Sequence, residues 1–241
     1  MLPEISKLFP REKVYEDMLR PAAQELGESF GNVVKTARFL LAPFDYLASQ
    51  QDRFQKYLKR IAEKVPQENL TEAPPQLVGK ILESLRYLDD DSILTEMYIN
   101  LLSVSVDKTR NSLAHPAFPI ILSALCRDEA IIIHFLKIEK YKLVEYIQFD
   151  NDKKIFNNAQ YIKNTFPVNI LDFPDNFIVY LNHLHSLNVA GIWQDGNQVP
   201  KIVNGIQIGV TINSVITFQR FGEMLAEACV VDDITKFGVS L

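Results

Sequence analysis

Apolar residues recur at intervals of three and four along most of the chain, a spacing typical of amphipathic helices. This pattern predicts helices over residues 30–47, 52–64, 77–88, 93–104, 115–125, 128–137, 175–189 and 218–229. Pro43 is expected to kink or divide the first helix, because proline removes a backbone donor and crowds the preceding turn. The acidic run 89–91 with Ser92 should end one helix and cap the next, and Asp128 should cap another. Short connections between residues 77 and 137 predict antiparallel neighbours in a helical bundle.

The composition of the sequence changes after about Glu139, where Tyr, Val and Ile lie among Asn, Asp and Lys. The helix predicted at 175–189 is followed by turns at Asp195-Gly196 and Asn204-Gly205, a β-like segment at 206–211, and the helix at 218–229. A helix, a hairpin and a packing element in this order are what a winged-helix unit requires, with residues 128–137 supplying its first helix. The sequence therefore predicts a mainly α protein, a helical bundle with a C-terminal winged-helix-like α+β portion.

Prolines suggest where the chain divides. Pro66, Pro74 and Pro75 punctuate the polar stretch 65–75, and residues before proline are pushed away from helical conformations. We therefore expect N-terminal amphipathic and basic helices at 1–64, a helical bundle core at 76–138, and a winged-helix-like portion at 139–241 that packs on residues 127–138.

Composition places the chain among folded proteins, with 47% apolar and 23% charged residues. The formal charge of −5 argues against a general polyanion binder. Positive charge gathers at the front, where residues 1–64 hold eleven Lys and Arg against nine Asp and Glu, while the remainder holds fourteen against twenty-one. No window has the roughly 18 consecutive apolar residues of a spanning helix. The charged, proline-containing N-terminus predicts no export signal, and hence a cytoplasmic protein.

Several short segments carry a family resemblance. They are Pro74-Pro75-Gln76-Leu77 through Leu85, Glu96-Met97 through Leu102, Ala114-His115-Pro116-Ala117-Phe118, Leu125 with Asp128-Glu129-Ala130, and Thr217 through Gly222 to Cys229. In this order they resemble the bacterial abortive-infection alpha family, a domain of unknown function linked to phage defence. The resemblance implies that the protein helps an infected cell to arrest or die before phage progeny are released. It implies no catalytic residue, because the family has no catalytic motif to carry over.

Candidate chemistry is sparse in the sequence. His183 and His185 lie two apart on a predicted helix, so they point to different faces and are poorly placed to share a metal. His115 precedes a proline at a helix start, where a turn hydrogen bond is the simpler role. Cys126 and Cys229 have neither zinc nor disulfide spacing, and we expect both to be buried. With no nucleophile motif and no glycine-rich phosphate loop, the sequence predicts a protein that is not an enzyme and uses no metal or cofactor.

The predicted winged-helix portion invites comparison with DNA-binding proteins. Between Lys163 and Lys201 there is no Lys or Arg, so the helix at 175–189 offers no cation to phosphates or guanine edges. We expect no sequence-specific DNA binding, and a protein contact or a structural role instead.

The N-terminal helices leave two alternatives open. An apolar helix followed by a cationic one can lie in a membrane interface, or the apolar face can pack on the bundle. The candidate membrane or partner contacts are Phe39, Leu40, Phe44, Arg53, Lys56, Lys59 and Arg60.

The sequence thus predicts a non-enzymatic interaction or effector protein of phage defence whose partner is a host or phage protein. The alternatives are a membrane-active effector that uses the N-terminal helices, peripheral to the inner membrane, and a winged-helix adaptor that binds another protein.

Overall fold

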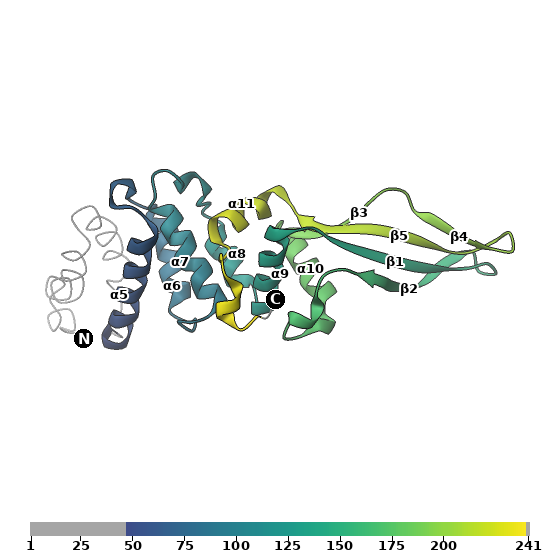
Figure 1. Ribbon diagram of the computed structural model, residues 1–241, viewed down its shortest axis with the longest axis horizontal. Coiled ribbons are helices and arrows are strands. Elements are labelled where there is room, and N and C mark those ends of the chain that lie inside the picture. Colours follow the sequence, from purple (N-terminus) through teal and green to yellow (C-terminus); the bar gives the residue numbers. More distant parts are fainter. Residues whose placement is uncertain (1–46, 240–241) are drawn as a thin grey trace, which may run out of the picture. The chain divides into compact units, whose positions relative to one another are not determined.

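The computed structural model describes residues 47–239, which form two compact units (Figure 1). The helical unit comprises residues 47–125 and 227–232, and the mixed unit comprises residues 126–226 and 233–239. The predicted helix at 30–47, with Pro43, lies outside the described residues apart from Leu47.

Four helices build most of the helical unit: α5 (Leu47–Lys64), α6 (Pro75–Leu85), α7 (Ile93–Ser105) and α8 (Phe118–Ala124), with 3₁₀ turns at Gln67–Asn69 and Asn111–Leu113. Helix α7 is apolar nearly all round and lies in the middle of the core, in contact with α5, α6 and α8. Ser92 caps α7, since its side chain accepts a hydrogen bond from the backbone N–H of Thr95 at 3.1 Å. The helices predicted at 52–64, 77–88, 93–104 and 115–125 correspond to α5, α6, α7 and α8, and the Ser92 cap is confirmed.

The mixed unit contains helices α9 (Arg127–Ile138) and α10 (Phe177–Ser186) and 3₁₀ turns at Val168–Ile170, Pro174–Asn176 and Ile234–Phe237. Helix α11 (Arg220–Cys229) begins in this unit. Five strands form one antiparallel sheet: β1 (Tyr141–Asp150), β2 (Ile155–Asn164), β3 (Ala190–Gln194), β4 (Val199–Val203) and β5 (Ile206–Phe218). Gly222 lets α11 approach the backbone of Val189 so closely that a side chain there would clash with the Val189 carbonyl.

The long strand β5 organises the sheet. It pairs with β1 along one edge, from Tyr141–Ile216 to Gln148–Gly209, and with β3 and then β4 along the other. The strand order is β2-β1-β5-β3, so β2 is an edge strand.

The sheet has two parts with different surroundings. Near α9 and α10, a core forms from Tyr141, Leu143, Ile216 and the stacked rings of Phe166 and Phe177. Farther along, β1, β2, β4 and β5 run beyond these two helices (Figure 1). We call residues 145–162 and 199–212 the distal sheet.

The predicted fold class is wrong, because the five-stranded sheet makes the protein α+β and not mainly α. The missed element is the β1–β2 hairpin. Nearly every residue of β2 is exposed, so the strand lacks the alternation of buried and exposed side chains that reveals a strand. The expected winged-helix unit is not confirmed. The segment predicted at 206–211 is the start of a thirteen-residue strand, and the β1–β2 hairpin stands between α9 and α10.

Candidate functional site

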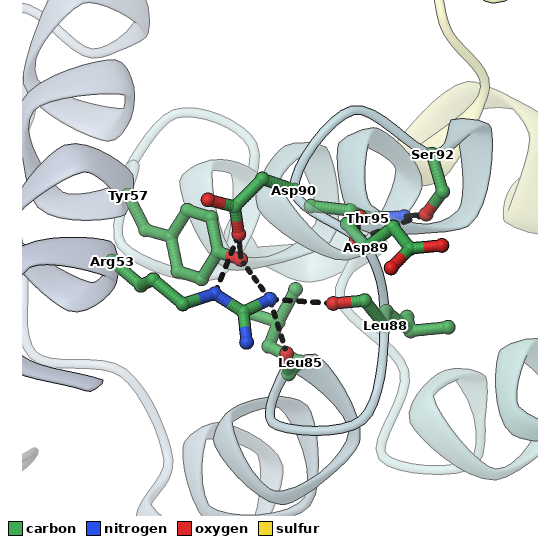
Figure 2. Close-up of polar contacts among 8 residues, drawn as sticks. All are labelled: Arg53, Tyr57, Leu85, Leu88, Asp89, Asp90, Ser92 and Thr95. Carbon is green, nitrogen blue, oxygen red and sulfur yellow. Dashed lines mark hydrogen bonds and ion pairs between the residues drawn. The ribbon is translucent and has the colours of Figure 1, made fainter. Parts of the chain in front are cut away.

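Arg53 on α5 makes four hydrogen bonds, one to Tyr57 on the same helix and three to the end of α6 and the α6–α7 connection (Figure 2). Its Nε donates to Asp90 Oδ1 at 2.6 Å, and its Nη2 donates to the hydroxyl of Tyr57 at 3.1 Å. The same nitrogen donates to the carbonyls of Leu85 at 3.5 Å and Leu88 at 2.5 Å. Arg53 therefore takes the place of a C-terminal cap for α6, whose last carbonyls have no partner within the helix.

Asp90 also accepts a hydrogen bond from the Tyr57 hydroxyl at 2.6 Å, so its carboxylate holds two donors from α5 (Figure 2). The Tyr57 hydroxyl and then the Arg53 guanidinium lower the pKa of Asp90 below its usual range. Burial, with the hydrogen bond to Asp90, raises the pKa of Tyr57 to about 12. The acidic run 89–91 was predicted only as a helix cap, and the use of Asp90 as an anchor for α5 was missed.

A second set of charges joins α5 to α7. Arg60 pairs with Glu96, and Lys64 Nζ lies 2.9 Å from Glu96 Oε1. Tyr57, Leu58, Ile61 and Val65 are buried beside these pairs. From Arg53 onward the apolar side of α5 therefore packs on the helical unit.

The candidate contact residues of the N-terminal segment divide into three groups. Arg53 and Arg60 are engaged with acidic groups of their own unit. Lys56 and Lys59 are exposed on α5. Phe39, Leu40 and Phe44 lie outside the described residues. Among the described candidates, the two lysines are the cations most open to a further partner.

In the mixed unit, acidic residues at the start of α9 are committed to structure. Glu129 is 3% exposed on its side chain, lies 2.5 Å from Nδ1 of His183 on α10, and accepts the backbone N–H of Cys126 at 2.9 Å. Asp128 is buried and accepts the backbone N–H groups of Asp172 and Phe173. The predicted cap is therefore wrong, since Cys126 is the N-cap of α9 and Asp128 fixes a distant loop.

The remaining candidate residues also have local roles. His115 Nδ1 accepts the backbone N–H of Ala117 at 3.1 Å, which confirms the predicted turn bond. His185 lies beside the ring of Trp193, on β3. Cys229 is buried as expected, but Cys126 is exposed because it stands at the N-terminus of α9. Within residues 47–239, no three His, Cys, Asp or Glu side chains are grouped as metal ligands would be.

A cleft of about 530 Å³ lies in the helical unit, lined by α6, α7 and α8. Three of its hydroxyls donate to backbone carbonyls: Ser84 to Lys80, Tyr98 to Pro119 and Ser123 to Ile120. What the cleft mainly offers a ligand is therefore apolar surface, including the exposed Tyr87 and Ile120.

Exposed apolar side chains gather elsewhere, on the distal sheet. Most of the large apolar side chains that are exposed in the described part of the chain lie on β2, on β4 and at the start of β5: Ile155, Phe156, Tyr161, Ile162, Val199, Ile202, Val203 and Ile206. These side chains line both edges of the distal sheet, β2 on one side and β4 with the start of β5 on the other. Scattered single apolar residues are normal on a surface, but so many on one part of a sheet favour a contact site. Sequence reasoning missed this surface because it missed the hairpin that carries half of it.

Comparison with models of known protein families shows which family the chain belongs to. The family model described as abortive infection alpha matches residues 49–229. The chain belongs to this family. No curated protein and no solved structure matches the chain.

The abortive infection alpha match begins in α5 and ends with α11, so it includes the Arg53–Asp90 contact and the whole sheet. The resemblance found in the sequence is thereby confirmed, and it connects the chain with abortive infection. Phe39, Leu40 and Phe44 precede the matched region. Among the described helices, none has the length and apolar character needed to cross a membrane.

Proposed function

We propose that this member of the abortive infection alpha family acts in phage defence as a non-enzymatic interaction protein, and that the distal sheet is its contact surface. A host or phage protein is the expected partner. The observation that carries the proposal is the group of exposed apolar side chains on β2, β4 and the start of β5. Burying such side chains against a partner releases ordered water, a gross gain of about 25 cal/mol for each Å² of apolar area that offsets the entropy lost on association.

The polar chemistry of the described residues supports a binding role over catalysis. Charged side chains that would attract attention in an active site are paired within their own unit, as Arg53 is with Asp90 and Glu129 with His183. Although Cys126 is exposed as a residue, partial desolvation of its sulfur, with the nearby Glu129 carboxylate, raises the pKa of the Cys126 thiol. A raised pKa favours the thiol over the nucleophilic thiolate, so Cys126 is poorly suited to attack a substrate.

The proposal is tested by a plaque assay in cells that express the full chain. Ile202 and Val203 on β4 are 61% and 46% exposed, so the double substitution Ile202→Lys/Val203→Lys should leave the fold intact while charging the contact surface. Val179→Lys is the matched control, because Val179 is 63% exposed on α10 and lies outside the distal sheet.

We expect the β4 double variant to lose protection against phage and the Val179 variant to keep it, at equal protein levels. Protection that survives the β4 substitutions, with the chain folded and expressed, would refute the assignment of the contact surface. Loss of protection in both variants would refute it as well, because the effect would not be specific to the distal sheet.

The exposed lysines of α5 favour a second candidate, an effector that contacts anionic membrane lipids. Lys56 and Lys59 stand free of the ion pairs that engage Arg53 and Arg60, and they lie on one basic helix. Each cation near an anionic surface contributes about 1 kcal/mol, so two lysines alone give weak binding.

A further inference from the structure

The middle of the edge strand β2 lacks charged residues and prolines, two of the features that keep edge strands from pairing. Proteins normally protect an exposed edge with charged residues, prolines, bulges or short length. Residues 155–162, Ile-Phe-Asn-Asn-Ala-Gln-Tyr-Ile, contain neither a charge nor a proline. Ile155, Phe156, Tyr161 and Ile162 are all about half exposed or more.

The sequence of this segment is self-complementary when it is read in the two directions. Ile155 corresponds to Ile162, Phe156 to Tyr161, and Asn157 to Gln160. Two copies that run antiparallel about an axis between residues 158 and 159 would therefore place isoleucine opposite isoleucine, ring opposite ring and amide opposite amide. Such cross-strand pairs of like shape stabilise antiparallel sheets.

A twofold axis perpendicular to a sheet keeps each side chain on its own face, so residues that meet across it must share a face. In a regular strand Phe156 and Tyr161 would point to opposite faces, because they are five residues apart. In β2 they share a face, since Phe156 pairs with Phe149 and Tyr161 with Glu145, four residues apart on the neighbouring strand β1.

The irregularity that changes the count is a bulge between these two pairs, where the register shifts and Asn158 adopts a φ of 51°. Asn157 and Gln160 share the other face for the same reason, because they pair with Gln148 and Tyr146. The bulge thus makes the Phe156–Tyr161 and Asn157–Gln160 pairings compatible with twofold symmetry. Ile162 lies at a second register shift of β2 and is not aligned with a residue of β1.

We propose that two copies of this chain associate through their β2 strands, antiparallel about a twofold axis between Asn158 and Ala159, to form one continuous sheet. This inference rests on the proposed function in one respect, that the distal sheet is a contact surface. It adds that the partner of the β2 edge is a second copy of the chain. The β4 side of the sheet remains open to a protein partner.

The size of the pairing sets its strength. Eight residues of strand on each copy are fewer than the roughly 20–30 residues a side of a standard interface, so the dissociation constant should be micromolar and not nanomolar. Charges sit just outside the paired segment, where Lys154 of one copy faces Lys163 of the other. Because salt screens this repulsion, association should strengthen as the salt concentration rises.

Light scattering on the full chain over about 1 to 100 μM, a range that brackets micromolar dissociation constants, tests the inference. The variants Phe156→Lys/Tyr161→Lys and Phe156→Glu/Tyr161→Glu place like charges opposite each other across the axis. Each alone should weaken self-association roughly tenfold or more, because like charges directly opposite destabilise a strand pair. An equimolar mixture of the two should restore the dimer, since every Lys then faces a Glu.

Restoration in the mixture shows that both variants are folded and that the register is the proposed one. Val179→Lys should dimerise like the unmodified chain. The inference is overturned if the unmodified chain stays monomeric throughout this range. It is also overturned if both doubly charged variants still form dimers, or if β2 binds lipid vesicles while the chain does not self-associate.

The outcomes separate this inference from the proposed function. If the chain is monomeric but Ile202→Lys/Val203→Lys still abolishes protection, the inference fails and the proposed function stands. If the dimer forms through β2 but the β4 variant protects fully, the proposed function fails and the inference stands.

Discussion

Asp90 anchors α5 to the helical unit, and replacing it by asparagine tests that role. Asp90→Asn keeps the size and one acceptor oxygen but removes the negative charge. The carboxylate accepts two hydrogen bonds of 2.6 Å, from Arg53 and from Tyr57. Arg53 keeps its bonds to the carbonyls of Leu85 and Leu88, so the substitution isolates the charge of Asp90.

The expected loss follows from these contacts. A hydrogen bond to a charged group contributes about 1.5–3 kcal/mol when it is shielded from water. The side chains of Arg53 and Asp90 are 23% and 33% exposed, so solvent screens part of that gain. We expect the free energy of unfolding of the chain to fall by about 1 to 2 kcal/mol, which for a chain of this length corresponds to a melting temperature lower by about 2 to 8 °C.

The assay is thermal unfolding at neutral pH together with hydrogen exchange at the amides of Leu58 and Ile61. Both amides should exchange faster in Asp90→Asn, because α5 opens more often. Asp91→Asn is the control, since Asp91 is an exposed neighbour of the same type and should change stability by less than about 0.5 kcal/mol. Equal effects of the two substitutions, or unchanged exchange in α5, would refute the anchoring role.

Four further outcomes are expected. Because the pKa of Tyr57 is raised to about 12, its contribution to stability should persist up to about pH 10 and be lost as the pH rises toward 12; alkaline unfolding of a Tyr57→Phe variant that matches the unmodified chain would contradict this. Glu129→Gln should lower stability by about 1 to 2 kcal/mol because the carboxylate that contacts Nδ1 of His183 and accepts the backbone N–H of Cys126 is replaced, seen as faster hydrogen exchange in α10 but not in α7. If α5 contacts membranes, Lys56→Glu/Lys59→Glu should abolish binding to anionic liposomes without unfolding the chain, and no binding by the unmodified chain would exclude that candidate. Helix α10 carries no Lys or Arg, so the chain should not shift duplex DNA at submicromolar concentration in about 150 mM salt, and a shift competed by one sequence alone would show the contrary.

Local sequence signals determined most of the helices and several of their ends. The spacing of apolar residues located α6 and α8 because one face of each helix must meet the core, so apolar residues recur at every third or fourth position of the sequence. Ser92 was recognisable as a cap because its hydroxyl needs only the backbone three residues on. The turn glycines at 196 and 205 take positive φ, as their Asp-Gly and Asn-Gly pairs predicted. The family, too, was evident from short motifs on these same elements.

The tertiary structure alone decided the sheet and the roles of the charged residues. Strand β2 is exposed on both faces, so its partner β1, and not a pattern of buried positions, makes it a strand. Asp90 resembles a helix cap in sequence, and only the approach of α5 from 37 residues away turns it into an anchor for Arg53. Glu129 likewise meets His183 across 54 residues. The periodicity of a sequence reflects contacts between residues three or four positions apart. Contacts between distant segments depend on which loops the folded chain closes, and only the packed tertiary structure determines them.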